Sequence, residues 1–244
     1  MNTNLELFNL EDEYGGAKVI SLAKPKVVAL GSFDGVHKGH STLIANLLRY
    51  PNLEPHIICV EKPFSRVFLF TRLEILQKIK EIVPTAEVSF LRLNSKIVDK
   101  TYLEFNKFLK QIDVHTAIVG QNFCYGKNRA GGVDTLKADF NVFVQELICE
   151  KGKIISSTSV KLAQKVGNFK LVNRLLGSDV YYEATPEKHY FILDSKKVLP
   201  LPGKYICIDE NQINFLVNLK QNRLILLNLK TIKTGKIKFV KKLK

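Results

Sequence analysis

The strongest constraint on the fold comes from one stretch near the N-terminus, where an apolar run leads through a glycine-rich turn into a helical pattern. Four consecutive apolar residues end the run Lys26–Leu30, and Gly31 follows it. Such a run is typical of a strand buried in a parallel sheet. Apolar residues then recur at helical spacing from Leu43 to Leu48, which predicts a helix beginning near His40. The segment Gly31–His40 (GSFDGVHKGH) therefore joins the carboxyl end of a strand to the start of a helix.

The same alternation of apolar runs and amphipathic stretches continues as far as Cys149. It predicts an α/β fold built on a doubly wound, mostly parallel sheet, because strands that alternate with helices pair in parallel. Such sheets bind ligands at the carboxyl ends of their strands. The further strands expected are His56–Val60, Glu87–Leu93, Ala117–Gly120 and Val142–Ile148, and the further helices are Leu69–Ile82 and Tyr102–Ile112.

The pattern changes after Ile155. Two short helices are expected at Ser157–Val166 and Asn168–Leu176, joined at Gly167 and ended at Gly177. From about Tyr182 the helical period gives way to short β-rich runs at Tyr190–Leu193, Tyr205–Ile208, Ile213–Leu219 and Arg223–Leu229. The sequence thus predicts an α/β domain over residues 1–182 and a small β-rich domain over residues 183–244.

The net charge and the apolar runs of the chain indicate which classes of partner it can bind. The chain of 244 residues carries a formal net charge of +14, and Lys230–Lys244 holds seven lysines and no acidic residue. That charge fits a polyanionic partner such as nucleotides, nucleic acid or a membrane surface, with the lysine-rich end as a basic arm for nucleic acid, and it fits a solvated lysine-rich surface equally well. No apolar run approaches the roughly 20 residues that span a bilayer, and the acidic, polar start is unlike a secretory signal. We therefore expect a cytoplasmic protein without a membrane partner, and leave nucleic acid open.

Two histidines give the glycine-rich turn its chemistry. Gly31, Gly35 and Gly39 allow a phosphate to approach backbone N–H groups, and the helix N-terminus adds its dipole. His37 and His40 are three residues apart, so both can face the same side and donate hydrogen bonds to phosphate oxygens. An HxxH pair alone is as consistent with a surface turn or part of a metal site. Together with the strand, the turn and the helix, it predicts a site that stabilises charge developing on a phosphate.

These residues resemble a known family. HxGH after the first strand resembles the Rossmann-like nucleotidyltransferase superfamily, and the longer Gly31–His40 segment resembles the G-x-F-D-G-V-H-x-G-H signature of the bacterial bifunctional riboflavin kinase/FAD synthetases, in their FMN adenylyltransferase domain. Further segments resemble family motifs in the same order: Leu69–Glu74, Val119–Gly126, Arg129–Gly131, Ile155–Thr158 and Asn173–Gly177.

The resemblance implies that AMP passes from ATP to FMN, with Mg²⁺, to give FAD and pyrophosphate. It assigns catalysis to His37, His40 and Lys161, which contact the ATP phosphates. It further implies ATP-binding roles for Gly31, Phe33, Gly39, Ser157 and Thr158, and flavin-binding roles for Asp34, Gly35 and Asn122, with no metal ligand supplied by the chain. From the residues alone, an N-cap cluster is the better interpretation of the serines and threonine before a helix, and Asn122 equally caps the loop after its strand.

The sequence also departs from the family. Ser159 and Lys161 stand where the family's I-S-S-T-R-x-R motif has arginines, and lysine lacks the bidentate fork. Val60–Phe64 replaces an F-x-P-H-P segment, which leaves Phe64 and Phe68 as a possible apolar wall or as core residues. Residues 183–244 are too short for a riboflavin kinase domain and lack its G-x-P-T-A-N-like motif. We therefore expect a shortened, inactive remnant of that domain. The alternatives to an FMN adenylyltransferase are a nucleotidyltransferase for another phosphorylated acceptor, or a non-catalytic nucleotide-, flavin- or nucleic-acid-binding protein.

Overall fold

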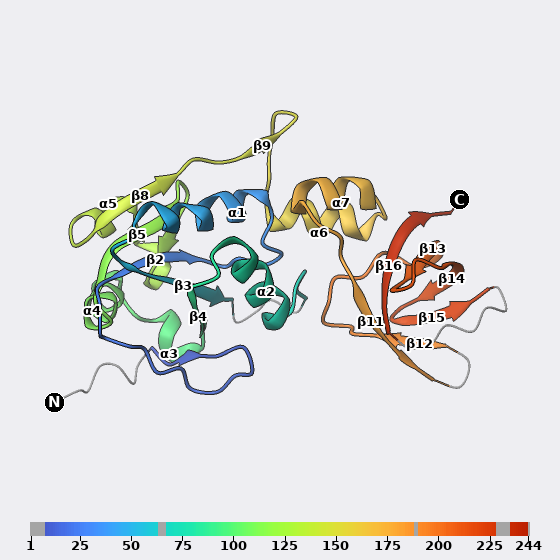
Figure 1. Ribbon diagram of the computed structural model, residues 1–244, viewed down its shortest axis with the longest axis horizontal. Coiled ribbons are helices and arrows are strands. Elements are labelled where there is room, and N and C mark those ends of the chain that lie inside the picture. Colours follow the sequence, from blue (N-terminus) through green and yellow to red (C-terminus); the bar gives the residue numbers. More distant parts are fainter. Residues whose placement is uncertain (1–7, 63–66, 188–189, 228–234, 244) are drawn as a thin grey trace. The chain divides into compact units, whose positions relative to one another are not determined.

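The computed structural model describes residues 8–62, 67–187, 190–227 and 235–243 (Figure 1). The chain forms two compact units, one of Met1–Ser65 and Phe70–Cys149 and the other of Arg66–Leu69 and Glu150–Lys244. By this grouping the helices after Ile155 belong with the C-terminal strands, and the domain boundary expected at residue 182 stays a prediction. None of the helices in the described part of the chain is long and apolar enough to cross a membrane.

A six-stranded sheet forms the centre of the first unit. Its order is β1 (Leu10–Glu11), β4 (Glu87–Arg92), β3 (Glu54–Glu61), β2 (Lys26–Gly31), β5 (Val114–Gly120) and β8 (Asn141–Gln145). The strands from β4 to β8 are parallel, and β1 alone among the six is antiparallel to its neighbour. The order reverses at β2, because the chain builds outward on one side through β3 and β4 and on the other through β5 and β8. The mostly parallel α/β sheet expected from the sequence is confirmed.

Helices connect these strands: α1 (Lys38–Ala45) with the 3₁₀ turn η2 (Asn46–Arg49), α2 (Arg72–Ile82), α3 (Ser95–Val98), α4 (Tyr102–Gln111) and α5 (Val133–Lys137). Thr71 and Thr101 begin α2 and α4 with capping boxes, in which each threonine is paired with the glutamate three residues on. The cap at Thr71 makes α2 start at Arg72 rather than at Leu69 as predicted. A loop of β6 (Cys124–Tyr125), η3 (Lys127–Arg129) and β7 (Gly131–Gly132) follows β5.

Burial of the central strands stabilises the sheet. The side chains of Val27, Val28 and Ala29 on β2 are 0% exposed, as expected for a strand covered on both faces. On one side, a cluster of buried apolar residues joins β4 and β5 to α4 and includes Phe105, Phe108 and Leu109. The strand that carries the glycine-rich turn is thus held in the most rigid part of the unit.

The second unit is built from helices and a closed barrel. After the short strands β9 (Cys149–Glu150) and β10 (Lys153–Ile154) come α6 (Ser157–Lys165) and α7 (Phe169–Leu176), which ends at the left-handed Gly177 as expected. The barrel order is β11 (Tyr182–Pro186), β12 (Phe191–Leu193), β15 (Arg223–Leu226), β14 (Asn214–Lys220), β13 (Gly203–Asp209) and β16 (Gly235–Lys242). Figure 1 shows these strands wrapping around one another.

The lysine-rich C-terminal segment is part of this barrel. The sequence suggested a basic arm over Lys230–Lys244, but β16 pairs with both β11 and β13. Ile237 and Phe239 are buried, while Lys236 and Lys241 are exposed and Lys238 and Lys242 are partly buried. The expectation of a free arm is therefore wrong for residues 235–242, because an alternating apolar pattern lies among the lysines.

Candidate functional site

The glycine-rich turn leaves β2 and enters α1 at Lys38, two residues earlier than the sequence suggested. His37 is the N-cap of α1: its Nδ1 accepts a hydrogen bond from the backbone N–H of His40, at 3.3 Å. A neutral imidazole whose Nδ1 accepts must carry its proton on Nε2. The cap therefore fixes one tautomer of His37 and leaves Nε2–H as its donor.

The two histidines form a stacked pair. Their ring centroids are 3.7 Å apart with an interplanar angle of 17°, and both come from the start of α1. Burial lowers the pKa of His37 to about 4. Burial, with a smaller effect of His37, also lowers the pKa of His40 well below its usual range. At neutral pH both imidazoles are uncharged hydrogen-bond donors at the N-terminus of a helix.

Close packing explains the glycines beside this pair. A Cβ on Gly31 would lie 2.9 Å from the Phe33 ring, and one on Gly39 would lie 3.3 Å from the His37 ring. Phe33 is fully buried, and its ring meets His40 edge-on with centroids 5.3 Å apart. Phe33 thus supports the histidine pair from the protein interior, and its role in binding ATP stays a prediction.

Asp34 and Gly35 shape the turn itself. The Asp34 carboxylate accepts a hydrogen bond from the backbone N–H of Phe70, at 3.4 Å, so it ties the turn to the segment before α2. Gly35 is buried and has φ of 86°, and the flanking Phe33 and Val36 also have positive φ. Such a run of left-handed residues is costly and usually marks a functional turn. The flavin-binding roles of both residues stay predictions.

A cavity of about 540 Å³ opens beside the histidine pair. Gly31 and Gly120, at the carboxyl ends of β2 and β5, both line it, and so do His40 and Asn122. These two strands flank the point where the strand order reverses, which is where open α/β sheets bind ligands. Of the residues predicted from the sequence, the structure brings Gly31, His40 and Asn122 together in one cavity wall.

The cavity has an apolar part and several cations that the sequence did not single out. Its apolar lining includes Phe105, Phe123 and Tyr125. The ring of Tyr125 contacts the rings of both Phe105 and Phe123. Lys62, Lys100 and Arg129 also line it; Lys100 bonds Glu104, and the Arg129 Nε donates to the Cys124 sulfur. No local pattern marks these cations, because they converge only through the order of the strands.

The remaining predicted site residues lie in the second unit, at the start of α6. Ser156 caps this helix and Ser159 completes a reciprocal capping box with it, so the residue that replaces the family's first arginine has a local structural role. Ser157 and Thr158 occupy the first turn. The Lys161 ammonium donates to the Val67 carbonyl oxygen at 2.9 Å. Phe64 lies outside the described residues, and Phe68 pairs with Lys197 in a β-bridge.

Comparison with known proteins matches residues 19–159 to the FAD synthetase family. The chain is 32% identical over 163 residues to a Geobacillus thermodenitrificans protein named putative bifunctional riboflavin kinase/FMN adenylyltransferase, covering 62% of this chain and 89% of that protein. It is 24% identical over 221 residues to a Listeria monocytogenes protein named FAD synthetase, covering 83% and 87%. The chain is 28% identical over 168 residues to the Escherichia coli K12 bifunctional riboflavin kinase/FMN adenylyltransferase. This match covers 62% of the chain and 54% of the E. coli protein.

A solved structure shares the fold. The crystal structure described as a macrolide-efflux protein from Streptococcus pneumoniae matches with a TM-score of 0.78, covering 96% of this chain and 90% of that one. At 18% sequence identity the likeness is one of fold alone.

Proposed function

Because the chain belongs to the FAD synthetase family, we propose that it transfers AMP from ATP to FMN and releases FAD and pyrophosphate. A phosphate oxygen of FMN attacks the α-phosphorus of ATP, and the bond from that phosphorus to the oxygen of the β-phosphate breaks. The observation that carries the proposal is the stacked, neutral pair of His37 and His40 at the start of α1, with His40 in the cavity wall.

The histidine pair suits this reaction because charge builds on the α-phosphate oxygens as the new bond forms. Preorganised donors there lower the barrier without supplying a nucleophile. The Nε2–H of His37 and the ring of His40 are such donors, and the N-terminus of α1 adds its dipole. Gly31 and Gly39 leave room for the rings of Phe33 and His37 beside this pair.

The cavity offers complementary ends for the two substrates. Its volume of about 540 Å³ lies in the range of small-molecule sites. We propose that the flavin ring occupies the aromatic part near Phe123 and Tyr125, with Asn122 beside it, and that the phosphates lie toward His40. Lys62 and Arg129, which line the same cavity, supply positive charge for phosphate groups.

The first turn of α6 is proposed to hold the terminal phosphates of ATP. Ser157 and Thr158 carry hydroxyls at a helix N-terminus, and Lys161 carries the positive charge that the resemblance assigns to this motif. Asp34 and Gly35 are proposed to shape the turn where nucleotide and flavin meet.

Mg²⁺ enters the proposal with ATP. The described residues contain no group of three or more His, Cys, Asp or Glu side chains arranged to hold a metal ion. The donor set therefore fits a cation carried mainly by the phosphate oxygens of ATP, which is the usual way Mg²⁺ is held at such sites. No step is derived through the ion.

We further propose that the barrel has no riboflavin kinase activity. The interior of the barrel is filled by large buried side chains, among them Tyr182, Tyr205 and Phe215. A relative whose name gives an FAD synthetase alone is matched over 87% of its length. Both observations support a single transferase activity.

One experiment tests both proposals. The purified protein is incubated with Mg²⁺ and ATP plus either FMN or riboflavin, and products are separated by chromatography. FAD and pyrophosphate should form from FMN, and neither FMN nor FAD should form from riboflavin. Parallel reactions with phosphopantetheine, nicotinamide mononucleotide and glycerol phosphate test the alternative of another acceptor. FAD formation no faster than in a no-enzyme control would refute the transferase.

A second candidate function, nucleic-acid binding, is favoured by where the charge lies. Residues 150–244 contain 19 lysines and arginines against 7 acidic residues, whereas residues 1–149 contain 18 against 16. Binding of labelled single-stranded RNA is measured across a range of salt concentrations. Affinity that falls steeply as salt rises, without any FAD formation, would favour this function over the transferase.

A further inference from the structure

A short N-terminal segment reaches the cavity although it lies outside the part of the chain that matches the family. The match covers residues 19–159, and the segment in question is Phe8–Asp12. Phe8 lines the cavity together with Leu91 and Phe105. The family match therefore assigns no role to a residue that forms part of the proposed substrate site.

Phe8 is held among aromatic rings at the apolar part of the cavity. Its ring stacks on Phe108, with centroids 4.8 Å apart and an interplanar angle of 26°, and meets Phe105 edge-on at 5.6 Å. Phe8 also lines a second cavity of about 250 Å³ beneath the N-terminal segment. The Phe8 side chain is only 4% exposed and belongs to the same buried apolar cluster as Phe105 and Phe108, and the segment that carries it is held by further contacts.

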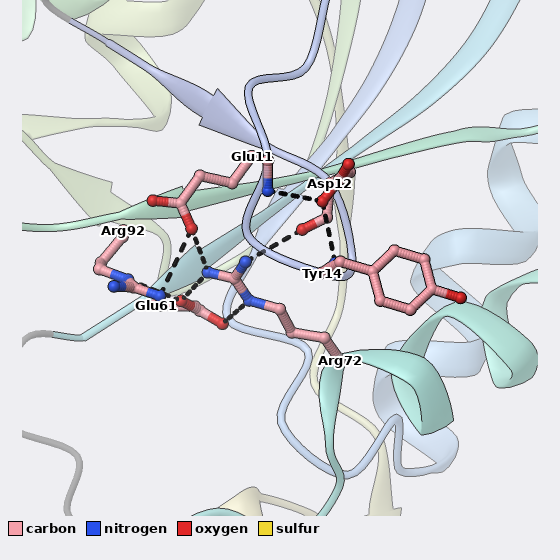
Figure 2. Close-up of polar contacts among 7 residues, drawn as sticks. Glu11, Asp12, Tyr14, Glu61, Arg72 and Arg92 are labelled. Carbon is pink, nitrogen blue, oxygen red and sulfur yellow. Dashed lines mark hydrogen bonds and ion pairs between the residues drawn. The ribbon is translucent and has the colours of Figure 1, made fainter.

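The anchor is a cluster of charged side chains (Figure 2). Strand β1 contributes only two pairs to the sheet, Leu10 with Leu91 and Glu11 with Phe90. Beyond these, the Arg72 Nη2 donates to the Glu11 carboxylate at 2.7 Å, and Nη1 donates to the Asp12 carbonyl oxygen at 3.0 Å. Arg72 thus forms hydrogen bonds with both the last residue of β1 and the residue that follows it.

Arg72 is itself fixed at the carboxyl edge of the sheet. It forms a two-pronged bond to Glu61, with N···O distances of 2.7 and 2.6 Å, and its guanidinium lies over the Phe90 ring. The hydrogen bonds that Arg72 donates to Glu61 and then to Glu11 raise the pKa of Arg72 above its usual range, so its guanidinium stays charged. Arg92 adds a second ion pair to Glu11 at 3.4 Å. The Arg72 and Glu11 side chains are only 13% and 21% exposed, and such shielded, forked pairs hold geometry better than surface pairs.

We propose that Phe8 contacts the flavin ring of the acceptor, and that Glu11 and Arg72 are positioning residues that hold Phe8 in the cavity wall. The inference rests on the proposed function, because it takes the apolar part of the cavity as the flavin site. A planar aromatic heterocycle gains area and ring contacts against the edge or face of a phenylalanine. ATP has no such dependence on Phe8 in this arrangement, so the two substrates should respond differently to its loss.

The test compares Phe8→Leu and Glu11→Gln with matched controls in the full-length protein. Phe140→Leu makes the same substitution in the same apolar cluster, at a residue that does not line the cavity. Glu81→Gln removes an exposed carboxylate that pairs with Lys78 on α2. FMN affinity is measured by quenching of flavin fluorescence without ATP, KM for each substrate by FAD formation, and folding by thermal melting.

Phe8→Leu should weaken FMN binding at least about fivefold and change the KM for ATP by less than about twofold. Glu11→Gln should weaken FMN binding about two- to fivefold, and the controls should leave it unchanged. If Glu11 acts through Phe8, the double variant should bind FMN no more weakly than Phe8→Leu alone, because two residues in one chain of contacts are not additive.

Equal FMN affinity in the wild type and Phe8→Leu would overturn the inference, and so would equal losses for FMN and ATP. Additive effects in the double variant would overturn the positioning role of Glu11. If Glu11→Gln fails to fold, the comparison of Phe8→Leu with Phe140→Leu still decides the role of Phe8. A wild type that binds FMN but forms no FAD would instead refute the proposed function, while the binding comparison would still test the contact.

Discussion

Replacing the N-cap histidine should separate its charge from its capping role. His37 accepts the hydrogen bond that begins α1, and asparagine is a strong N-cap that does not titrate. His37→Asn should therefore keep the helix start while removing an ionisable group. At pH 7.5, where the buried imidazole is neutral, the free energies of unfolding of variant and wild type should agree within about 0.5 kcal/mol.

At acidic pH the wild type and His37→Asn should differ in their free energy of unfolding. The pKa of His37 is lowered from 6.5 to about 4 by burial, so below pH 6.5 the unfolded chain binds a proton that the folded protein does not. Stability linked to this group is complete above pH 6.5 and is lost as pH falls toward 4. At 1.36 kcal/mol per pKa unit, the loss at pH 5 amounts to about 2 kcal/mol.

Urea unfolding followed by circular dichroism at pH 7.5 and pH 5 measures this difference. Between the two pH values the wild type should lose about 2 kcal/mol more than His37→Asn. His37→Ser, a second non-titrating cap, should behave like the asparagine variant. Equal losses in all three proteins would show that His37 is not held neutral by burial, and would refute the account of the histidine pair as uncharged donors.

Four further outcomes follow from particular side chains. His40→Ala should lower kcat by about 100-fold or more in the FAD assay, with the fold intact by circular dichroism, if His40 stabilises the transition state; an unchanged kcat would remove that role. Lys161→Arg should lower the KM for ATP several-fold and leave that for FMN unchanged, because arginine adds a bidentate fork; an equal or higher KM for ATP would contradict its place on the triphosphate. Ser156→Ala should reduce the free energy of unfolding by about 1 kcal/mol through loss of the capping box, and no change would contradict the cap. Phe239→Ala should cost about 3–5 kcal/mol, whereas Val240→Ala, at a 42% exposed position, should cost far less; equal effects would argue against β16 as a barrel strand.

Local signals in the sequence predicted the part of the site that is itself local. The strand, the glycine-rich turn and the histidine pair are contiguous, so propensity and spacing were enough to place them, and the family membership they suggested is confirmed. The helix start was predicted near His40 but lies at Lys38. The reason is that a histidine serves as the N-cap, and histidine is not among the residues by which caps are recognised in sequences.

Contacts between distant segments were not predictable in the same way. Lys62, Lys100 and Arg129 line one cavity because they lie in connections that follow β3, β4 and β5, and the order of those strands in the sheet is not written in any single segment. The lysine-rich segment was misjudged for a different reason. Its apolar residues Ile237 and Phe239 alternate as a strand requires, but the charge around them dominated the pattern.

Neutral donors have a mechanistic advantage at a site that must release pyrophosphate. A cationic pair would bind the phosphates of substrate, transition state and product alike, and such uniform binding does not raise kcat. Uncharged imidazoles aimed from a rigid helix start interact most strongly where negative charge increases during the reaction. Residues 1–149 hold 18 basic and 16 acidic residues, so their net charge attracts anions little beyond the cations that line the cavity, Lys62, Lys100 and Arg129. We propose that selective stabilisation of the transition state comes from the geometry of His37 and His40, which form a stacked pair at the start of α1.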